Sequence, residues 1–420
     1  MVKDEQYDLL IAGAGASGLS LAYYLTQHRE FSGKILLVDK DKKNKNDRTW
    51  CFWGQLEAPF QQLVSKSWSF LSYCDEKDVV KRPVDKLGYH MIQGIDFYNY
   101  MYDVLTPHPN IDFFYGEIDS YVDLGDEVVT YVDGGRRIFR SRLMANSAII
   151  NRPEDDRKYF SMLQHFQGYF IRTKQAKFDP QHAYLMDFRN DQQKHLNFFY
   201  MLPMSETEAL VEFTIFSDSL EENEYYEENL ERYIHDTLQV DDYEITEKER
   251  GAIPMTDAPF KKSVSDRVIN IGTAGGAVKP TTGYAFVRIL EQSKGIADYI
   301  AGNQKKLKQP AYNRFRFYDQ LLLWILTAYG STEIGKYIFS HLFRKNNMER
   351  ILNFLSENSP VTDDIRIFAT LPIKPFLKAI AGNIPRWLAL HKSRLLGSKT
   401  NQNRIPVSEN PEVVVNVPGV

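Results

Sequence analysis

The stretch YDLLIAGAGASGLSLAYYL, residues 7–25, holds a strand, a glycine-rich turn and a helix in direct succession. The apolar run Tyr7–Ala12 predicts a buried strand, and the apolar spacing after the turn predicts an amphipathic helix. The turn between them has GxGxxG spacing, formed by Gly13, Gly15 and Gly18. In this context the spacing is typical of a dinucleotide-binding unit.

Each part of this turn has its own physical role. Gly13 allows the tight turn, Gly15 lets the backbone approach a pyrophosphate, and Gly18 lets the helix pack closely on its strand. The first helical residues, Ala16 and Ser17, present free N–H groups to the phosphates.

A second apolar strand, in KILLVDK at residues 34–40, ends in an acid. Asp39 follows Gly18 by 21 residues, where this fold places the carboxylate that binds an adenosine ribose. Strand, helix and acid together favour a bound nucleotide over a glycine-rich turn without a ligand. They do not separate FAD from NAD(P).

The segment DRVINIGTAGGAVKPTTGYAFVRILEQSKGIADYI, residues 266–300, repeats this order far down the chain. A strand at Val268–Ile271 leads into a loop, and a long helix follows. The loop residues expected to contact the cofactor are Gly272, Thr273, Gly275, Gly276, Pro280, Thr281 and Gly283. Two such loops imply one cofactor domain assembled from distant segments, as in FAD-binding folds of the hydroxylase type. Those folds usually carry Gly-Asp where this chain has Gly272-Thr273.

Four ordered motifs carry a family resemblance: NDRTWCFW (46–53), LVEFT (210–214), GAIPMTD (251–257) and IGTAGGAVKPTTGYAFVRI (271–289). Together they resemble the FAD-dependent lycopene cyclases of the bacterial type, which close the ends of linear carotenoids. The resemblance covers most of residues 5–300 and continues more weakly beyond. It implies reduced FAD, kept reduced by NAD(P)H, and lycopene or a related acyclic carotenoid as substrate.

The expected fold is α/β: a Rossmann-like FAD-binding domain of the hydroxylase type, an antiparallel β-sheet substrate domain and a C-terminal helical region. We place the FAD-binding domain at 1–75, 111–155 and 245–305, and the substrate domain at 76–110 and 156–244. A basic helical region at 306–404 and a loose tail at 405–420 complete the chain.

The segment NFFYMLPMSETEALVEFTIFS, residues 197–217, predicts a hairpin with SETE as its turn. Glu212 then lies in an apolar strand, where burial would raise the pKa of its carboxyl and suit it to general acid/base work. An outward-facing position is the alternative, because alternation leaves one face wet. In lycopene cyclases the essential first Glu of a FLEET-like motif falls on Glu212.

EKERGAIPMTDAP, residues 247–259, offers two more carboxylates just before an expected strand and loop. The family usually has acids before its IPMT-like stretch, so Glu249 is a second candidate catalytic residue. Glu247 is more simply a solvated turn charge.

The NDRTWCFW motif is expected to be a loop that lines the site. Trp50, Phe52 and Trp53 would offer apolar walls and negative ring faces to a developing cation, and Tyr284 would join them at the substrate. Their packing beneath the flavin is the plainer alternative. Arg48 is expected to contact the cofactor.

One segment departs from the family. Lycopene cyclases commonly show Asp-Ser-Arg where this chain reads Asn146-Ser147-Ala148. The roles of that Asp and Arg therefore do not carry over.

Composition narrows the partners. A net charge of −4 gives no reason to expect nucleic acid, and Cys51 and Cys74 lack the spacing of a metal site or a disulfide framework. The apolar run LLLWILTAY is too short to span a bilayer. Residues 365–408 hold eight Lys and Arg and no Asp or Glu, which suits an anionic membrane surface or, alternatively, an exposed helical cap. We expect a cytoplasmic enzyme on the inner face of the cell membrane.

Two other classes of function remain open from the sequence. A FAD-dependent monooxygenase or reductase acting on an apolar isoprenoid would share the cofactor architecture, and a carotenoid-binding protein without turnover would share the cavity. The sequence leaves open whether one or both ends are cyclised, and whether the ring is beta or epsilon.

Overall fold

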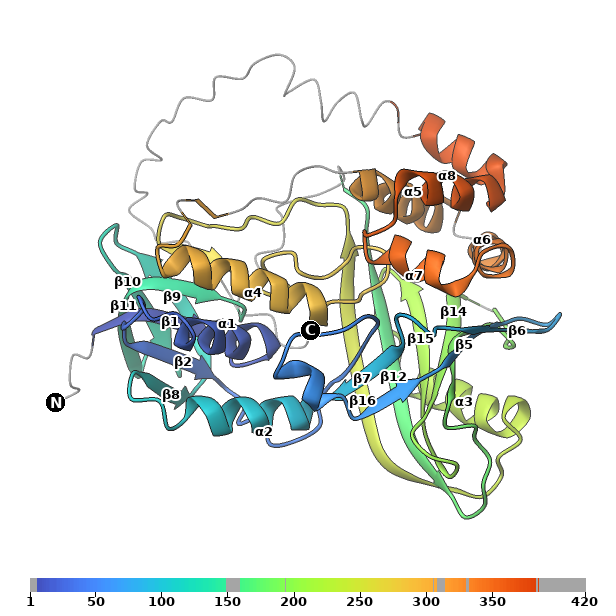
Figure 1. Ribbon diagram of the computed structural model, residues 1–420, viewed down its shortest axis with the longest axis horizontal. Coiled ribbons are helices and arrows are strands. Elements are labelled where there is room, and N and C mark those ends of the chain that lie inside the picture. The colour runs from blue at the N-terminus through green and yellow to red at the C-terminus, as the bar shows by residue number, and fades with distance from the viewer. Residues whose placement is uncertain are drawn as a thin grey trace.

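The computed structural model describes residues 6–148, 159–192, 194–304, 306–307, 314–329, 332–382 and 384. Two seven-stranded sheets and a three-stranded sheet carry the fold, and helices pack on the two larger sheets (Figure 1). We call the first the mixed sheet and the second the large sheet.

The mixed sheet contains the glycine-rich turn. Its strands lie in the order β8 (Ile111–Tyr115), β2 (Ile35–Asp39), β1 (Gln6–Ala12), β11 (Arg137–Asn146), β10 (Val128–Val132) and β9 (Ile118–Asp123), with β17 (Val268–Asn270) beside the end of β11. The pairs β1–β2, β1–β11 and β11–β17 are parallel, so these strands end at the same edge of the sheet. Such an edge is where open α/β sheets bind ligands.

Three helices cover one face of the mixed sheet: α1 (Ala16–Thr26), α2 (Gly94–Leu105) and α4 (Phe286–Ile300). Ile11 of β1 packs in one core with Leu19, Met101 and Ile296, one from each helix. Helical spacing of apolar residues gives α2 and α4 one buried face each, whereas α1 is buried on nearly all sides. The expected strands and helices around both glycine-rich segments are confirmed.

The large sheet has the order β16 (Tyr243–Thr256), β12 (Ser161–Thr173), β15 (Glu208–Ser217), β14 (Leu196–Pro203), β13 (His182–Asp187), β5 (Phe70–Cys74) and β6 (Val79–Pro83). All neighbours pair antiparallel except β13 and β5. The hairpin expected around SETE is confirmed as β14–β15.

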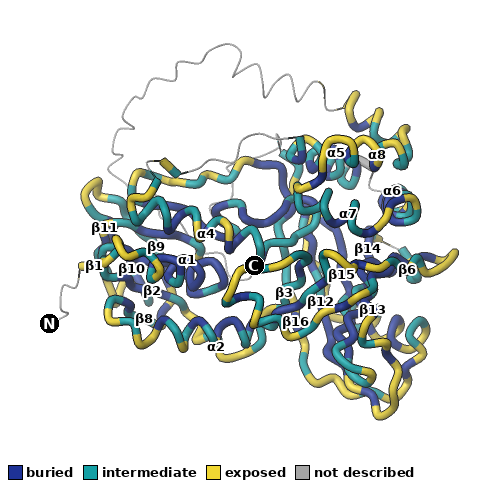
Figure 2. The backbone as a smooth tube through the Cα atoms, viewed as in Figure 1, coloured by how far each residue is buried: buried dark blue, intermediate teal, exposed yellow. Residues whose placement is uncertain are grey.

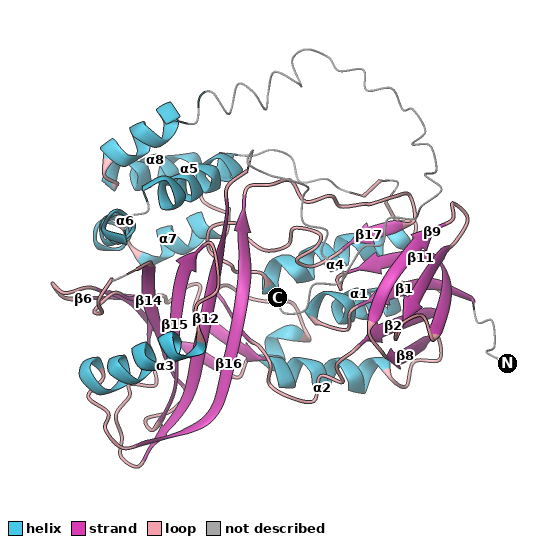
Figure 3. Ribbon diagram, turned by 180° about the vertical axis from the view of Figure 1, so that it is seen from behind, coloured by secondary structure: helices cyan, strands magenta, loops and turns pink. Residues whose placement is uncertain are grey.

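The large sheet is buried on both faces. Along β15, Val211 and Phe213 pack under α3 (Asn223–Arg232) and its π-helical extension Tyr233–Thr237. The alternating residues Leu210 and Phe216 pack in a second core with the C-terminal helices (Figure 3). Glu212 shares the parity of Leu210 and so lies on the face toward those helices.

The C-terminal helices are α5 (Arg314–Tyr329), α6 (Thr332–Lys345), α7 (Met348–Leu355) and α8 (Val361–Thr370), and residues 373–382 are also helical. Within the described ranges, none of the helices has the length and apolarity that crossing a bilayer requires. The last part of the predicted basic region, residues 385–404, and the predicted tail lie outside the described residues.

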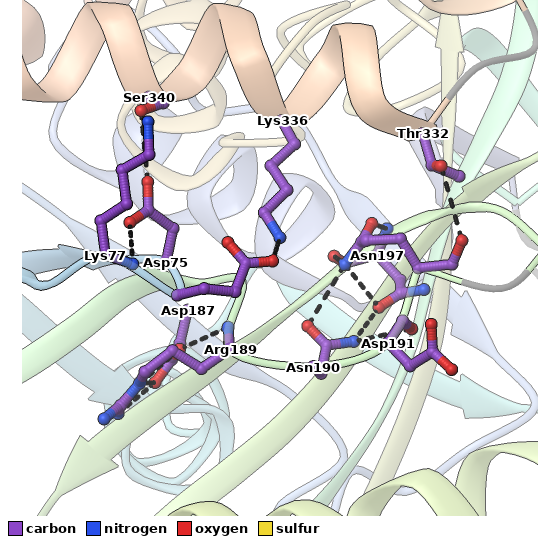
Figure 4. Close-up of polar contacts among 12 residues, drawn as sticks. Asp75, Lys77, Asp187, Arg189, Asn190, Asp191, Asn197, Thr332, Lys336 and Ser340 are labelled. Carbon is purple, nitrogen blue, oxygen red and sulfur yellow. Dashed lines mark hydrogen bonds and ion pairs between the residues drawn. The ribbon is translucent and has the colours of Figure 1, made fainter.

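Polar contacts tie α6 to the large sheet (Figure 4). Lys336 pairs with Glu76, and the Ser340 hydroxyl donates to Asp75 over 3.2 Å. At the start of the helix, the Thr332 hydroxyl donates to the Gln192 carbonyl over 3.5 Å. These contacts fix α6 above the ends of β5 and β14.

The third sheet corrects the expectation of a loop at NDRTWCFW. Thr49–Phe52 forms β3, which pairs antiparallel with β7 (Tyr89–Gln93), and β7 also pairs with β4 (Lys66–Trp68). The pairing partner lies about forty residues further along the chain. The polar neighbourhood of the motif therefore hid a strand that tertiary pairing creates.

The predicted domain boundaries stay a prediction, but three elements lie outside their expected domains. β5 and β16 belong to the large sheet, although the sequence analysis placed both ranges in the FAD-binding domain. Helix α2 packs on the mixed sheet, although it was placed in the substrate domain. Glu249 is consequently inside the 14-residue strand β16 rather than just before a strand.

Candidate active site

Both glycine-rich segments meet at the carboxyl edge of the mixed sheet. A Cβ on Gly13 would stand 2.4 Å from the Ser147 hydroxyl, and a Cβ on Gly272 would stand 2.9 Å from the Cβ of Ser17. Both glycines have positive φ, +100° and +60°. The ends of β1, β11 and β17 and the start of α1 thus come together as the two motifs predicted.

This edge fits a dinucleotide. Among the described atoms, nothing lies within 4 Å of where a Cβ on Gly15 would stand, so the backbone there is open to a ligand. The Ser17 hydroxyl is buried and, within the described part of the chain, has no hydrogen-bond partner. Asp39 accepts a hydrogen bond from the Ala14 N–H over 2.6 Å, which holds its carboxylate beside the turn. An open backbone, an orphaned hydroxyl and a held carboxylate suit phosphates and a ribose.

The second loop divides its residues between two tasks. Thr273 and Gly283 line the cavity described next, while Gly275 and Gly276 lie where the loop turns back on Asn270 and Phe260. The Thr281 hydroxyl donates to Asp319 over 2.7 Å. That hydroxyl, expected at the cofactor, is therefore engaged by helix α5. Pro280 precedes it in the same loop.

The departing segment Asn146-Ser147-Ala148 lies at the same edge. The Asn146 amide donates to Asn270 over 2.9 Å in a buried pair, and the Ser147 hydroxyl donates to the Ala12 carbonyl over 2.7 Å. These contacts join β1, β11 and β17. The substituted Asn146 therefore acts in the strand edge, and the retained Ser147 is the residue of this segment that lines the carboxyl cavity.

An open cavity with about 1380 Å³ of empty space lies between this edge and the large sheet. We call it the carboxyl cavity; it is lined by Glu212, Glu249, Trp50, Ser147, Thr273 and Gly283, among others. It also includes Arg48, which donates to the Arg250 carbonyl over 3.3 Å. The structure thus brings predicted cofactor residues and both candidate acids to one space.

The two acids face each other across a glycine. Glu212 of β15 and Glu249 of β16 are both directly opposite Gly168 of β12, one on each side. Directly opposed residues point to the same face of an antiparallel sheet. Because Gly168 has no side chain, the two carboxyl groups reach over it and hydrogen-bond to each other.

Each acid also has an outer hydrogen-bond donor. The Thr214 hydroxyl donates to Glu212 over 2.7 Å, and the Thr49 hydroxyl donates to Glu249 over 2.7 Å. Thr49 arrives from β3, the strand that the sequence analysis had expected to be a loop. The donors leave the inner carboxyl oxygens to face each other.

The environment raises both carboxyl pKa values, but unequally. Burial raises the pKa of Glu212 well above its ordinary value, and repulsion from Glu249 raises it further. Burial also raises the pKa of Glu249, whereas the donor Thr49, the hydrogen bond with Glu212 and the charge of Arg48 oppose the rise. Glu212 is therefore the member of the pair that holds a proton more tightly.

Two tyrosines that the sequence analysis missed, Tyr89 and Tyr200, extend the site around the predicted Tyr284. Tyr200 of β14 is directly opposite Glu212, and its hydroxyl bonds to that of Tyr284. Tyr284 in turn shares a 2.8 Å hydrogen bond with Tyr89 of β7. Burial raises the pKa of all three hydroxyls, so they stay neutral. Two strands, β14 and β7, and the loop before α4 bring the three tyrosines together.

A second cavity, with about 1030 Å³ of empty space, lies under the C-terminal helices. We call it the aromatic cavity; its walls include Phe198, Phe216, Phe315, Phe339, Phe343 and Phe368. It shares four lining residues with the carboxyl cavity: Gln164, Tyr200, Thr282 and Tyr284. The two cavities therefore meet at the tyrosines.

The aromatic residues of NDRTWCFW have three different places. Trp50 lines the carboxyl cavity and stacks on Phe286 at 5.1 Å between ring centres. Trp53 lines the aromatic cavity, and its indole N–H donates to Ser356. Phe52 is 3% exposed and belongs to the core on the mixed sheet, packed against Phe286, so the packing alternative describes it.

A buried ionic cluster joins the second loop to the C-terminal helices. The Lys279 ammonium contacts Asp319 of α5 at 2.9 Å and Glu357, which follows α7, at 3.1 Å. Arg288 of α4 also pairs with Glu357, at 3.0 Å. Lys279 and Asp319 line the aromatic cavity, so this cluster is a charged point in an otherwise apolar wall.

Solved structures with a similar fold are flavoproteins. A geranylgeranyl bacteriochlorophyll reductase-like protein from Thermoplasma acidophilum is 13% identical, with TM-score 0.53 over 93% of this chain and 99% of that chain. HpxO from Klebsiella pneumoniae, solved as a variant with FAD, is 13% identical, with TM-score 0.56 over 87% and 99%. A variant of the flavin-dependent brominase Bmp2 gives TM-score 0.59 at 13% identity over 86% and 98%. The fold is thus the α/β fold of FAD-dependent hydroxylases, as the sequence predicted.

Relatives by sequence are more specific. A lycopene beta-cyclase from Paracoccus sp. (strain N81106 / MBIC 01143) is 24% identical over 305 residues, which are 70% of this chain and 73% of that protein. The family described as lycopene cyclase protein matches residues 8–381, which include both glycine-rich loops and both acids of the carboxyl cavity. The chain belongs to the lycopene cyclase family.

Proposed function

We propose that this protein cyclises the linear ends of lycopene to beta-ionone rings, giving gamma-carotene and beta-carotene without net oxidation or reduction. The observation that carries the proposal is the pair Glu212–Glu249, which lines the carboxyl cavity directly opposite Tyr200, one of the residues shared with the aromatic cavity. The apolar walls of the aromatic cavity suit a long polyene, whose reacting end would then lie toward the carboxyl pair.

The chemistry needs a proton donor, a cation stabiliser and a base. Burial raises the pKa of Glu212 well above its ordinary value and so favours the protonated carboxyl, which would protonate the terminal alkene. The face of Trp50 and the hydroxyl dipoles of Tyr200 and Tyr284 would lower the energy of the tertiary cation. Loss of a ring proton to a carboxylate ends the reaction.

The cofactor proposed is FAD in its reduced form, with NAD(P)H as the reductant. Gly13, Gly15, Ser17 and Asp39 would hold its diphosphate and ribose, and Thr273 and Gly283 would approach the ring system from the carboxyl cavity. When bound and reduced, FAD would supply negative charge beside the cation.

We further propose docking on an anionic lipid surface through the end of the C-terminal helices. Ile373, Leu377, Ile380 and Ile384 recur at helical spacing and are 66%, 59%, 40% and 50% exposed (Figure 2). Lys374 and Lys378 lie beside this apolar stripe. An exposed apolar stripe with flanking basic residues suits the interface of an anionic membrane, in which a carotenoid would be stored.

The docking surface can be tested with liposomes. Neutralising Lys374, Lys378, Arg386 and Lys392 together should weaken binding to anionic vesicles by about 1 kcal/mol per charge, with little change on neutral vesicles. The last two of these residues lie outside the described part of the chain. Unchanged binding would move the docking surface elsewhere.

The function itself is tested by expressing the chain in cells that accumulate lycopene and resolving their pigments by chromatography. We expect conversion to gamma-carotene and beta-carotene. Unchanged lycopene with a verified, FAD-loaded protein would reject cyclisation. Stoichiometric consumption of NAD(P)H and oxygen would instead favour a monooxygenase, and retained pigment without turnover would favour a binding protein.

A further inference from the structure

Strand β12 lies between Glu212 and Glu249, and its residue at that position, Gly168, has no side chain. Neighbouring strands are about 4.8 Å apart, so the backbones of Glu212 and Glu249 are separated by about 10 Å with β12 between them. A Cβ on Gly168 would stand 3.1 Å from Cγ and 3.4 Å from Oε1 of Glu249, and 3.0 Å from Leu210. A side chain at this position would therefore displace the side chain of Glu249, which lies over Gly168 on the way to Glu212.

We propose that Gly168 is a positioning residue that lets Glu212 and Glu249 share one proton and serve in turn as acid and base. This inference rests on the proposed function for its substrate, but the shared proton itself does not. It adds to the two candidate acids of the sequence analysis their joint use of one proton and the backbone position that lies between them.

The proton balance closes within the pair. The O–H bond of Glu212 breaks as a C–H bond forms at the terminal alkene carbon, which leaves two carboxylates facing a tertiary cation. The neighbouring alkene then forms the ring bond. A ring C–H bond finally breaks, and its proton returns to the pair, with Glu249 as the nearer base. No proton or electron is gained or lost overall.

Between protonation of the alkene and loss of the ring proton, Glu212 and Glu249 are both ionised, and this state favours the cation. Two adjacent carboxylates repel each other, and a cation placed against them relieves that repulsion. The pair is thus electrostatically suited to the intermediate rather than to the neutral substrate. Each outer threonine donor keeps its carboxylate in place while the inner oxygens change their protonation.

The groups that face the pair are few. Arg48 and Cys51 approach from β3 and the residue before it, Glu247 lies in the same strand as Glu249, and Tyr200 and Tyr284 approach from the tyrosine side. The thiol and the two phenols have raised pKa values and stay neutral. We therefore expect any change of protonation in this site at neutral and mildly alkaline pH to occur at Glu212 or Glu249.

The first test is an infrared pH titration of the purified, FAD-loaded protein, following the C=O stretch of protonated carboxyl groups. In the unmodified protein we expect a band that persists above neutral pH and is lost in Glu212→Gln. Gly168→Ala should shift the titration of this band to lower pH by at least one unit, because the displaced Glu249 no longer repels the ionised form of Glu212. No such band, or an unshifted one, would overturn the proposal.

The second test is a double-mutant cycle on cyclisation. Gly168→Ala should lower kcat by about 10²-fold with little change in KM, and it should have little further effect in a Glu249→Gln background. A purely structural penalty would instead add to that of Glu249→Gln, and this result would overturn the positioning role. Circular dichroism and flavin absorbance establish that each variant folds.

Glu249→Gln alone covers the case in which Gly168→Ala fails to fold. It keeps the size of the side chain but removes the second ionisable group, so the infrared band of Glu212 should titrate at lower pH than in the unmodified protein. An unchanged titration would overturn proton sharing. Failure of the proposed function is distinguishable, because an inactive protein that still shows the band and its shift retains the pair and lacks only the expected substrate.

Discussion

The carboxyl cavity and the aromatic cavity share four lining residues, but the rest of their linings differ in chemical character. The first is framed by strand ends and glycines and holds two acids; the second is walled by phenylalanines from the large sheet and the C-terminal helices. The carboxyl cavity contains two acids that can change their charge, whereas the aromatic cavity offers a mostly apolar surface. The difference separates two tasks, chemistry and holding, which single substitutions should affect independently.

The largest effect is expected from removing the proton donor. Glu212→Gln preserves size and hydrogen bonding but cannot protonate an alkene, so ring formation should fall by about 10³-fold or more while FAD stays bound. Pigment chromatography and flavin absorbance measure the two properties. Glu206→Gln, an exposed position in the turn of the same hairpin, is the matched control. Full activity of Glu212→Gln would remove this residue from the catalytic role.

The next effect concerns the buried ionic cluster of Lys279, Asp319 and Glu357 beside the aromatic cavity. Asp319→Asn leaves buried Lys279 with Glu357 as its remaining carboxylate, which should lower the free energy of unfolding by about 3 kcal/mol. Chemical denaturation measures this loss. Arg172→Gln, which breaks an exposed pair with Glu208, should cost under about 1 kcal/mol. Equal losses in the two variants would show that burial of the cluster contributes nothing.

A smaller effect should follow from narrowing the aromatic cavity without touching the acids. Leu322→Trp adds bulk to its wall and should raise KM for lycopene by about 10-fold while kcat changes little, since about 1–3 kcal/mol is a usual cost of overpacking. Glu212→Gln should show the opposite pattern. A loss of kcat alone in Leu322→Trp would mean that the two cavities do not act separately.

The last prediction is of a different kind, a pH-dependent gain in stability. A carboxyl whose pKa is raised by folding stabilises the native state least at high pH, because the unfolded chain ionises near pH 4.5 while the folded chain must still hold the proton. Glu212→Gln should therefore be more stable than the unmodified protein at pH 8, by roughly 1.4 kcal/mol per unit of pKa shift, and equal to it near pH 4. Thermal denaturation at both pH values checks the sign. A difference that shrinks as pH rises would contradict the raised pKa.

Short-range sequence patterns were sufficient to predict many of the strands, turns and helices of this molecule. The strand, glycine turn and helix at Tyr7–Leu25 and at Val268–Ile300 can be read within one window, because each element buries its own apolar stripe. The hairpin that carries Glu212 could be predicted in the same way. Fold class and one acid followed from these windows.

The rest of the site depends on pairings between distant strands. Nothing within its own segment reveals that Glu249 lies in a strand, or that this strand and the strand of Glu212 flank Gly168. The same holds for Tyr200, Tyr89 and the pairing of Lys279 with Asp319. Sheet register is set by tertiary packing, so a carboxyl pair formed across three strands has no local signature.

The placement of β1 and β17 on the two sides of β11 also has a consequence for biosynthesis. The nucleotide edge needs strands that begin at residues 6 and 268, so a ribosome must complete most of the chain before that edge can close. Contacts of such long sequence separation form late in folding. The cofactor would then bind late, and only to nascent chains in which every strand of the large sheet has already been synthesised.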